Sequence, residues 1–248
     1  MAAGVLPSRT PSAVTRTAMY VYGVADRGRT VRGSGVADAA VGTLAHGSLA
    51  AIVSPVPSLH LRAKRRDILA HQDVLQRAFA KGIIIPFRFG TVFAGEDAVI
   101  SELLEPRHDE LARLLERLDG LVELSVRAYY VEDAVLREIV RDDSRVAGLK
   151  GRAGDVALGE AVAKALAAKR AAEAETIEKT LLPFADDAVI EAPRTEYELF
   201  RGAFLVRASD VDAFDAQMDV LAADRDGTVV FKYVGPLPPH SFVGVEVT

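Results

Sequence analysis

The sequence contains no cysteine and no tryptophan, and these absences narrow the possible functions before any motif is considered. Without cysteine there can be no disulfide framework, no thiolate zinc site, no iron–sulfur cluster and no cysteine nucleophile. Long apolar runs are also absent, since none approaches the ~18 to 20 residues that a transmembrane helix requires. We therefore expect no membrane span.

The chain also has no excess of basic residues. It contains 30 Lys and Arg and 35 Asp and Glu, which gives a formal net charge of −5 over 248 residues. A protein whose main role is to coat nucleic acid carries the opposite charge, so nucleic acid is not an expected partner. Half of the residues are apolar, which is enough for a large buried core. At about 150 residues per domain, the length allows one large domain or two smaller ones.

The composition changes along the chain and suggests four segments. Residues 1–17 contain no acid and are rich in Ser, Thr, Pro and Arg, which predicts a disordered tail. Residues 18–119 and 120–234 each mix strand and helix patterns, which predicts two α+β domains. Residues 235–248 begin with a proline-rich stretch, which predicts a stiff C-terminal arm.

Within 18–119 the hydrophobic pattern predicts two strands, a helix, an extended segment and a second helix. The first helix carries Ile68, Leu75 and Phe79 on its buried stripe, with His71 at the edge of that stripe. Pro106 predicts a break early in the second helix. The expected ranges are 19–25 and 47–55 for the strands, 63–80 for the first helix, 83–93 for the extended segment and 104–118 for the second helix.

The pattern of 120–234 is easier to interpret. Residues 121–131 alternate between apolar and polar side chains, which is typical of a half-buried strand. Ser209 and Asp212 have the spacing of a capping box at the start of a helix. The elements follow in the order β-α-β-β-α-β, which is the ferredoxin-like plan of a four-stranded antiparallel sheet with both helices on one face. The remaining expected ranges are helices at 133–141, 155–182 and about 210–221, and strands at 187–192, 199–207 and 228–234.

No catalytic or metal-binding motif emerges from the sequence. The five histidines, His46, His60, His71, His108 and His240, are scattered and show no His-x-x-x-His or His-Glu-x-x-His spacing. We therefore expect no catalytic residue, no metal and no cofactor. An enzyme and a small-ligand-binding regulatory module, both on a ferredoxin-like scaffold, remain as alternatives.

The basic run Arg62–Asp67 opens the first helix, where cations are poorly placed against the helix dipole. Such a cluster either binds an anionic partner or is simply solvated. Since the run contains no aromatic residue, it lacks the stacking groups of most single-strand binders.

An aromatic segment at 85–93 is a candidate for protein binding. It places Phe87, Phe89 and Phe93 around Arg88 in an extended stretch that Pro86 and a glycine keep from full strand pairing. An incompletely paired strand can accept another chain at its edge. The alternative is that the phenylalanines enter the core while the arginine faces solvent.

The C-terminal arm is the second candidate. Its prolines leave few backbone donors and make it rigid, so it loses little entropy on docking. It either straps the two domains together or presents Leu237 and Phe242 to a partner.

Four stretches of the chain resemble the gas vesicle protein F/L family. They are Tyr20–Val24 (YVYGV), Pro86–Phe93 (PFRFGTVF), Val122–Arg127 (VELSVR) and Gly235–Val243 (GPLPPHSFV). Their order and spacing cover roughly residues 19 to 245. In the last stretch this chain has Leu237 and His240 where the family usually carries Trp and Tyr.

The resemblance implies a non-enzymatic role in building the gas vesicle, at the vesicle and in the cytoplasm. The implied partners are the gas vesicle structural protein A, which forms the hydrophobic shell, and other accessory proteins. Such a role is physically reasonable, because a shell subunit with an apolar face is prone to aggregate before it assembles. The candidate protein-binding residues are Phe87, Arg88, Phe89, Phe93, Pro236, Leu237, Pro238, Pro239, His240 and Phe242.

Overall fold

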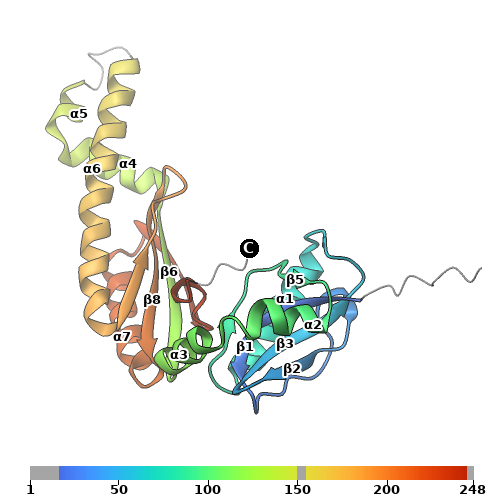
Figure 1. Cartoon of the computed structure of the whole chain (residues 1–248). Helices are drawn as coiled ribbons and strands as arrows, with labels where there is room; N and C mark the ends of the chain where they lie inside the picture. The colour runs from blue at the N-terminus through green and yellow to red at the C-terminus, as the bar shows by residue number, and fades with distance from the viewer. Residues whose placement is uncertain (1–16, 150–154, 245–248) are drawn as a thin grey trace, which may run out of the picture.

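The computed structural model in Figure 1 describes residues 17–149 and 155–244. Within them the chain is a mixed α+β structure with two antiparallel sheets and helices. Apart from Thr17, the tail predicted to be disordered lies outside the described residues, as do residues 150–154 between the expected helices 133–141 and 155–182. We call residues 17–119 the N-terminal half and residues 120–244 the C-terminal half.

The N-terminal half is built on β1 (Ala18–Asp26), a strand of β-branched, aromatic and small residues that is buried along all but its last position. Strand order is β2-β3-β1-β4, and β5 also pairs with β1. Helix α1 covers one face of this sheet, while α2, η2 and α3 cover the other. The other elements are β2 (Gly42–His46), β3 (Leu49–Val56), α1 (Arg65–Phe79), β4 (Ile85–Pro86), β5 (Val92–Phe93), α2 (Glu96–Ala98), the π-helix η2 (Val99–Leu104) and α3 (His108–Leu118), with a 3-10 turn η1 (Val36–Asp38).

The structure corrects two predictions for this half. Strand β2 was not predicted, because its five residues are mostly exposed and include a glycine, and so lack an apolar pattern. On α1, Ile68 is 36% exposed whereas His71 is only 4% exposed, so the buried stripe is rotated relative to the prediction. The break near Pro106 is confirmed, since α3 begins two residues later.

The C-terminal half has the predicted succession of strands and helices, with one further short helix, α5, before the long one. The strand order is β7-β8-β6-β9. Helices α6 and α7 pack against one face of this sheet and bury its apolar side chains. The elements are β6 (Leu121–Tyr130), α4 (Glu132–Asp142), α5 (Ser144–Leu149), α6 (Asp155–Leu181), η3 (Leu182–Phe184), β7 (Asp187–Ile190), β8 (Glu198–Arg207), η4 (Ala208–Asp210), α7 (Val211–Asp224), β9 (Val229–Leu237) and η5 (His240–Phe242).

Two further predictions for this half are wrong. The expected capping box is not formed: Asp210 occupies the N-cap of α7 without a side-chain bond to the helix, and Ser209 Oγ donates to the Asp210 carboxylate instead. Strand β9 does not end at Val234 but continues to Leu237, which pairs with Glu123 across a bulge. The arm therefore begins as part of the sheet.

The two halves share one hydrophobic cluster. Leu115 and Leu118 of α3 belong to the same cluster as Ala203 and Leu205 of β8, on the sheet face opposite α6 and α7. Phe242, at the end of the arm, is 7% exposed and joins this cluster. Burial of this shared surface holds the halves together.

Candidate protein-binding site

The aromatic segment lies at the edge of the first sheet, as predicted, where β4 and β5 both pair with β1. Phe87 is 2% exposed and Phe93 is 7% exposed, and both belong to the core on the α3 side of the sheet. Phe89 is half-buried, and Arg88 is exposed. Of the four candidate residues in the segment, Arg88 and Phe89 are thus the two with accessible surface.

A buried histidine holds the loop between β4 and β5. His71 Nδ1 lies 2.8 Å from the Tyr20 hydroxyl, and that hydroxyl accepts a hydrogen bond from the Gly90 amide at 3.2 Å. Since the hydroxyl proton is then available to His71, Nδ1 acts as the acceptor. The Phe89 ring packs edge-on to the imidazole, with 5.8 Å between centroids. The contacts of His71 with Tyr20 and Phe89 therefore hold the loop against α1.

The electrostatics of this cluster favour neutral groups. The pKa of His71 is lowered from 6.5 to about 4, mainly by burial and to a lesser extent by the nearby His240, while a hydrogen bond to the Phe87 backbone opposes the shift. Burial also raises the pKa of Tyr20 above its usual value. Both side chains are therefore uncharged at neutral pH, which suits a structural anchor better than an acid–base pair.

Glycine is required where the backbones of this region approach most closely. A Cβ at Gly23 of β1 would lie 2.4 Å from the Ile85 carbonyl oxygen of β4. A Cβ at Gly235 would lie 2.4 Å from Leu124 Cδ2 and 3.2 Å from the Glu123 carbonyl oxygen. A larger residue at Gly23 would push β4 away, whereas one at Gly235 would first have to displace the Leu124 side chain.

The C-terminal arm contacts both halves. Glu123 of β6 accepts hydrogen bonds from the Ser241 amide at 2.7 Å and the Ser241 hydroxyl at 3.1 Å. Arg117 of α3 donates to the Phe242 carbonyl at 2.8 Å, and Gln76 of α1 donates weakly to the Pro236 carbonyl at 3.5 Å. These contacts favour strapping over free presentation of the arm.

The alternation of residues 121–131 places Glu123 among the polar side chains of its strand, yet Glu123 is only 5% exposed because the arm covers it. Burial raises its pKa, while the two hydrogen bonds from Ser241 oppose that rise. The sequence carried no signal for this contact, since the partners are 118 positions apart.

The residues of the arm differ in how far they are exposed. Pro238, Pro239 and Phe242 are buried, Leu237 is half-buried, and Pro236 and His240 are exposed. Because Pro236 contacts α1 through Gln76 and His240 lies near His71, the arm and the aromatic segment meet beside α1. We name the accessible residues of these two segments the junction surface: Arg88, Phe89, Pro236, Leu237 and His240.

The basic run at the start of α1 is partly paired within the chain. Arg66 lies 3.3 Å from Asp38 and 3.5 Å from Asp67. Asp67 in turn accepts a hydrogen bond from the Ala37 amide at 3.2 Å. Part of this cluster therefore stabilises the contact between α1 and the loop before β2.

Ser48, His108 and Asp109 form a hydrogen-bonded series on the surface of the N-terminal half. Ser48 Oγ lies 3.2 Å from His108 Nε2, and His108 Nδ1 lies 3.2 Å from Asp109 Oδ1. A catalytic triad has a buried acid and N–H donors for an oxyanion. The Asp109 side chain is 90% exposed, and the Ser48 amide is directed at Nε2, 3.3 Å away. The series thus has the order of a triad, but its acid is exposed to solvent.

Among residues 17–149 and 155–244, no group of three or more His, Cys, Asp or Glu side chains is arranged to hold a metal ion. In the same ranges, no helix combines the length and apolar character that crossing a membrane demands.

Comparison with known proteins identifies the class. The family model described as "Gas vesicle synthesis protein GvpL/GvpF" matches residues 18–244. The chain therefore belongs to the GvpL/GvpF family, as the sequence motifs predicted.

Its relatives include both branches of that family. Gas vesicle protein F of Streptomyces sp. (strain CB03234) is 37% identical over 238 residues, covering 90% of this chain and 98% of the relative. Gas vesicle protein L of the same organism is 28% identical and covers 82% of each chain. The identity is thus higher to the F protein than to the L protein.

Solved structures show the same fold. The crystal structure of GvpF from Anabaena sp. PCC7120 superimposes with a TM-score of 0.81 at 22% identity, over 93% of this chain and all of that one. GvpF from Microcystis aeruginosa gives 0.78 at 16% identity, over 92% and 100% of the two chains.

Proposed function

We propose that this protein is a non-enzymatic accessory protein of gas vesicle assembly, which binds the hydrophobic shell protein, gas vesicle structural protein A, and other accessory proteins. The observation that carries the proposal is the family match over residues 18–244. It acts at the gas vesicle and in the cytoplasm. Binding protects an aggregation-prone shell subunit until it is incorporated.

The domain organisation belongs to the same proposal. Residues 18–119 form one α+β domain and residues 120–234 a second, with residues 235–248 as a proline-rich C-terminal arm. The second domain is ferredoxin-like, a reading supported by the strand order β7-β8-β6-β9 with α6 and α7 on one face.

We place shell-protein binding at the junction surface. Its residues come from two segments that are about 150 positions apart in the sequence and meet beside α1. Phe89 offers part of an aromatic ring, Leu237 a partly exposed aliphatic chain, and Arg88 a charge. Aromatic residues and arginine are enriched where protein interfaces are strongest.

The test is co-purification of the shell protein with this chain and with the double variant Arg88→Ala/Phe89→Ser. We expect at least roughly tenfold less shell protein with the variant, since hot-spot truncations cost more than about 1.4 kcal/mol. Val220→Ser on α7 is the matched control, because Val220 is 52% exposed and lies on the other side of the second sheet. Equal recovery with all three proteins contradicts the assignment of this surface.

A negative result at the junction surface would leave the family role open, so the wild-type protein provides the decisive measurement. If the wild-type protein retains the shell protein neither at low salt nor at high salt, the binding proposal itself is wrong. Turnover of a substrate, or calorimetric binding of nucleotides or amino acids, would support the alternatives instead.

A further inference from the structure

Strand β9 lies at one edge of the second sheet, because in the order β7-β8-β6-β9 it pairs with β6 alone. Its outer side has no neighbouring strand within residues 17–149 and 155–244. A sheet edge of nine residues presents backbone amide and carbonyl groups to which a second chain can add. Residues 229–234 of this edge lie outside the junction surface.

The pairing register identifies which backbone groups of β9 face outward. The Val131 amide donates to the Thr228 carbonyl at 2.9 Å, and hydrogen-bonded positions alternate along an antiparallel pair. Thr228 and every second residue after it therefore turn their backbone groups toward β6. Phe231 and Tyr233 turn theirs to the open edge, where neither has a backbone partner among the described residues.

The side chains along this edge are apolar and basic on the face opposite α6 and α7. Phe231 and Tyr233 pack toward the helices, so the residues that alternate with them face the other way. Of these, Val230 is 50% exposed and Val234 is 54% exposed, and Lys232 is exposed between them. The edge thus offers two aliphatic contacts with a positive charge at the centre.

The charge at Lys232 ends a row of three cations across the sheet. Lys232 lies directly opposite Arg127 of β6, which lies opposite Arg201 of β8. Arg201 is neutralised, since its Nη2 lies 2.6 Å from the buried Glu198 carboxylate. Arg127 and Lys232 are both exposed, and like charges at directly opposed positions destabilise a sheet. A carboxylate on the far side of Lys232 would relieve this repulsion.

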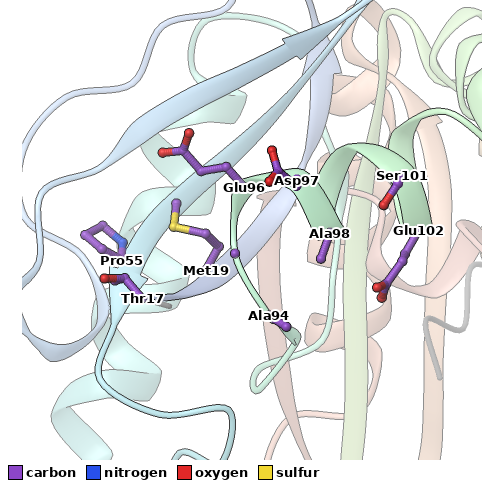
Figure 2. A pocket seen from close by; sticks show the side chains of 10 residues that line it. Thr17, Met19, Pro55, Ala94, Glu96, Asp97, Ala98, Ser101 and Glu102 are labelled. Carbon is purple, nitrogen blue, oxygen red and sulfur yellow. The ribbon is translucent and has the colours of Figure 1, made fainter. Parts of the chain in front are cut away.

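The molecule carries the opposite charge at the pocket beside β1 and β3. Figure 2 shows Glu96, Asp97 and Glu102 around this pocket, which has a volume of about 620 Å³. An acidic segment is therefore repelled there and attracted to Arg127 and Lys232.

We propose that the free edge of β9 binds an extended acidic segment of a partner protein, which adds to the sheet as a fifth strand antiparallel to β9. The outward backbone groups of Phe231 and Tyr233 bond the segment. The positions beside them form the pairs without hydrogen bonds, at which side chains lie closest. The segment therefore has the pattern apolar-x-acid-x-apolar, with the acid opposite Lys232. This inference stands whether or not the junction surface binds the shell protein.

A second copy of the chain is a poorer occupant than an acidic segment. In the symmetric antiparallel pairing that aligns the exposed valines of two β9 strands, Lys232 of one copy lies opposite Lys232 of the other. A lysine at an exposed edge opposes self-pairing for this reason.

Amide exchange of the full chain, followed by NMR, tests the proposal with the blocked peptide Thr-Val-Thr-Glu-Thr-Val-Thr. At a peptide concentration of about ten times the titration midpoint, exchange of the Phe231 and Tyr233 amides should slow roughly tenfold. The Lys232 amide already bonds β6 and should not change. The same peptide with Lys in place of Glu should bind roughly tenfold more weakly, because two cations then repel it.

Lys232→Glu should reverse this preference and favour the lysine peptide. The variant should keep its fold, because an acid at this position faces Arg127 across the strand pair. Lys164→Glu on α6 is the matched control: Lys164 is also exposed, and the change in net charge is the same. This control should retain the wild-type preference for the glutamate peptide.

Three results would overturn the proposal. One is unchanged exchange at Phe231 and Tyr233 up to the solubility limit of the glutamate peptide. Another is protection of the same amides by a single-stranded oligonucleotide and not by the peptide, which assigns the face to nucleic acid. The third is protection without peptide that grows with protein concentration, which assigns the edge to a second copy.

Discussion

Lowering the pH from 7 to 4 should destabilise the N-terminal half, because His71 enters the fold without a proton. The imidazole is 4% exposed, and burial lowers its pKa from 6.5 to about 4. Between these values the unfolded chain binds a proton at this residue and the folded chain does not, so stability is lost as the pH falls. At about 1.36 kcal/mol for each pKa unit, the full loss is about 3 kcal/mol.

Urea unfolding at several pH values between 7 and 4 measures this loss in the wild type and in His71→Gln. Comparison of the two slopes isolates the histidine, because the carboxylates titrate in both proteins. His60→Gln is the control for the substitution itself, since His60 is exposed. An imidazole that titrates near pH 6.5 in the NMR spectrum of the folded protein would refute the reasoning.

Three further outcomes are expected from the packing. Phe87→Ala should lower the free energy of unfolding by about 3 to 5 kcal/mol, and Phe89→Ala by clearly less, because only Phe87 is fully buried; equal losses by chemical denaturation would contradict this difference. Phe242→Ala should cost a similar 3 to 5 kcal/mol (about the range for a buried aromatic) and separate the unfolding of the two halves, whereas a single unshifted transition would deny the shared core. Ser241→Ala should cost about 1 to 3 kcal/mol, because the buried Glu123 loses a hydrogen bond, and Glu123→Gln in the same background should recover part of that loss.

The sequence predicted an element well where burial on one face produced a regular pattern. Strand β6 alternates between buried and accessible side chains along most of its length, and its predicted and observed ranges agree within one residue. Strand β2 lies at a sheet edge with little burial, so no comparable pattern marked it. The break before α3 was predictable because Pro106 acts locally.

Contacts between distant residues were not predictable from local patterns. The buried stripe of α1 includes His71 because Tyr20, 51 positions earlier, supplies a hydrogen-bond partner. Glu123 is buried because Ser241 satisfies its carboxylate. In both cases a polar residue took an interior position that hydrophobic periodicity alone assigns elsewhere.

For the candidate site, the sequence identified the two segments but not which of their residues a partner can reach. Alternation in 85–93 left open whether the phenylalanines were core or contact, and the structure divides them: Phe87 and Phe93 are buried, while Phe89 remains partly accessible. Whether the accessible ones bind the shell protein remains a prediction.

The long helix α6 extends beyond the sheet against which it packs. At 1.5 Å per residue, the 27 residues of α6 extend about 40 Å, whereas the ten residues of β6 extend about 33 Å. In Figure 1 the far end of α6, with α5 beside it, stands clear of the sheet on the side away from the N-terminal half. A body bound at that tip and another bound at the first sheet would be kept well apart. Shortening α6 by whole turns would then reduce the distance between the two bound partners and leave the contacts of each partner intact.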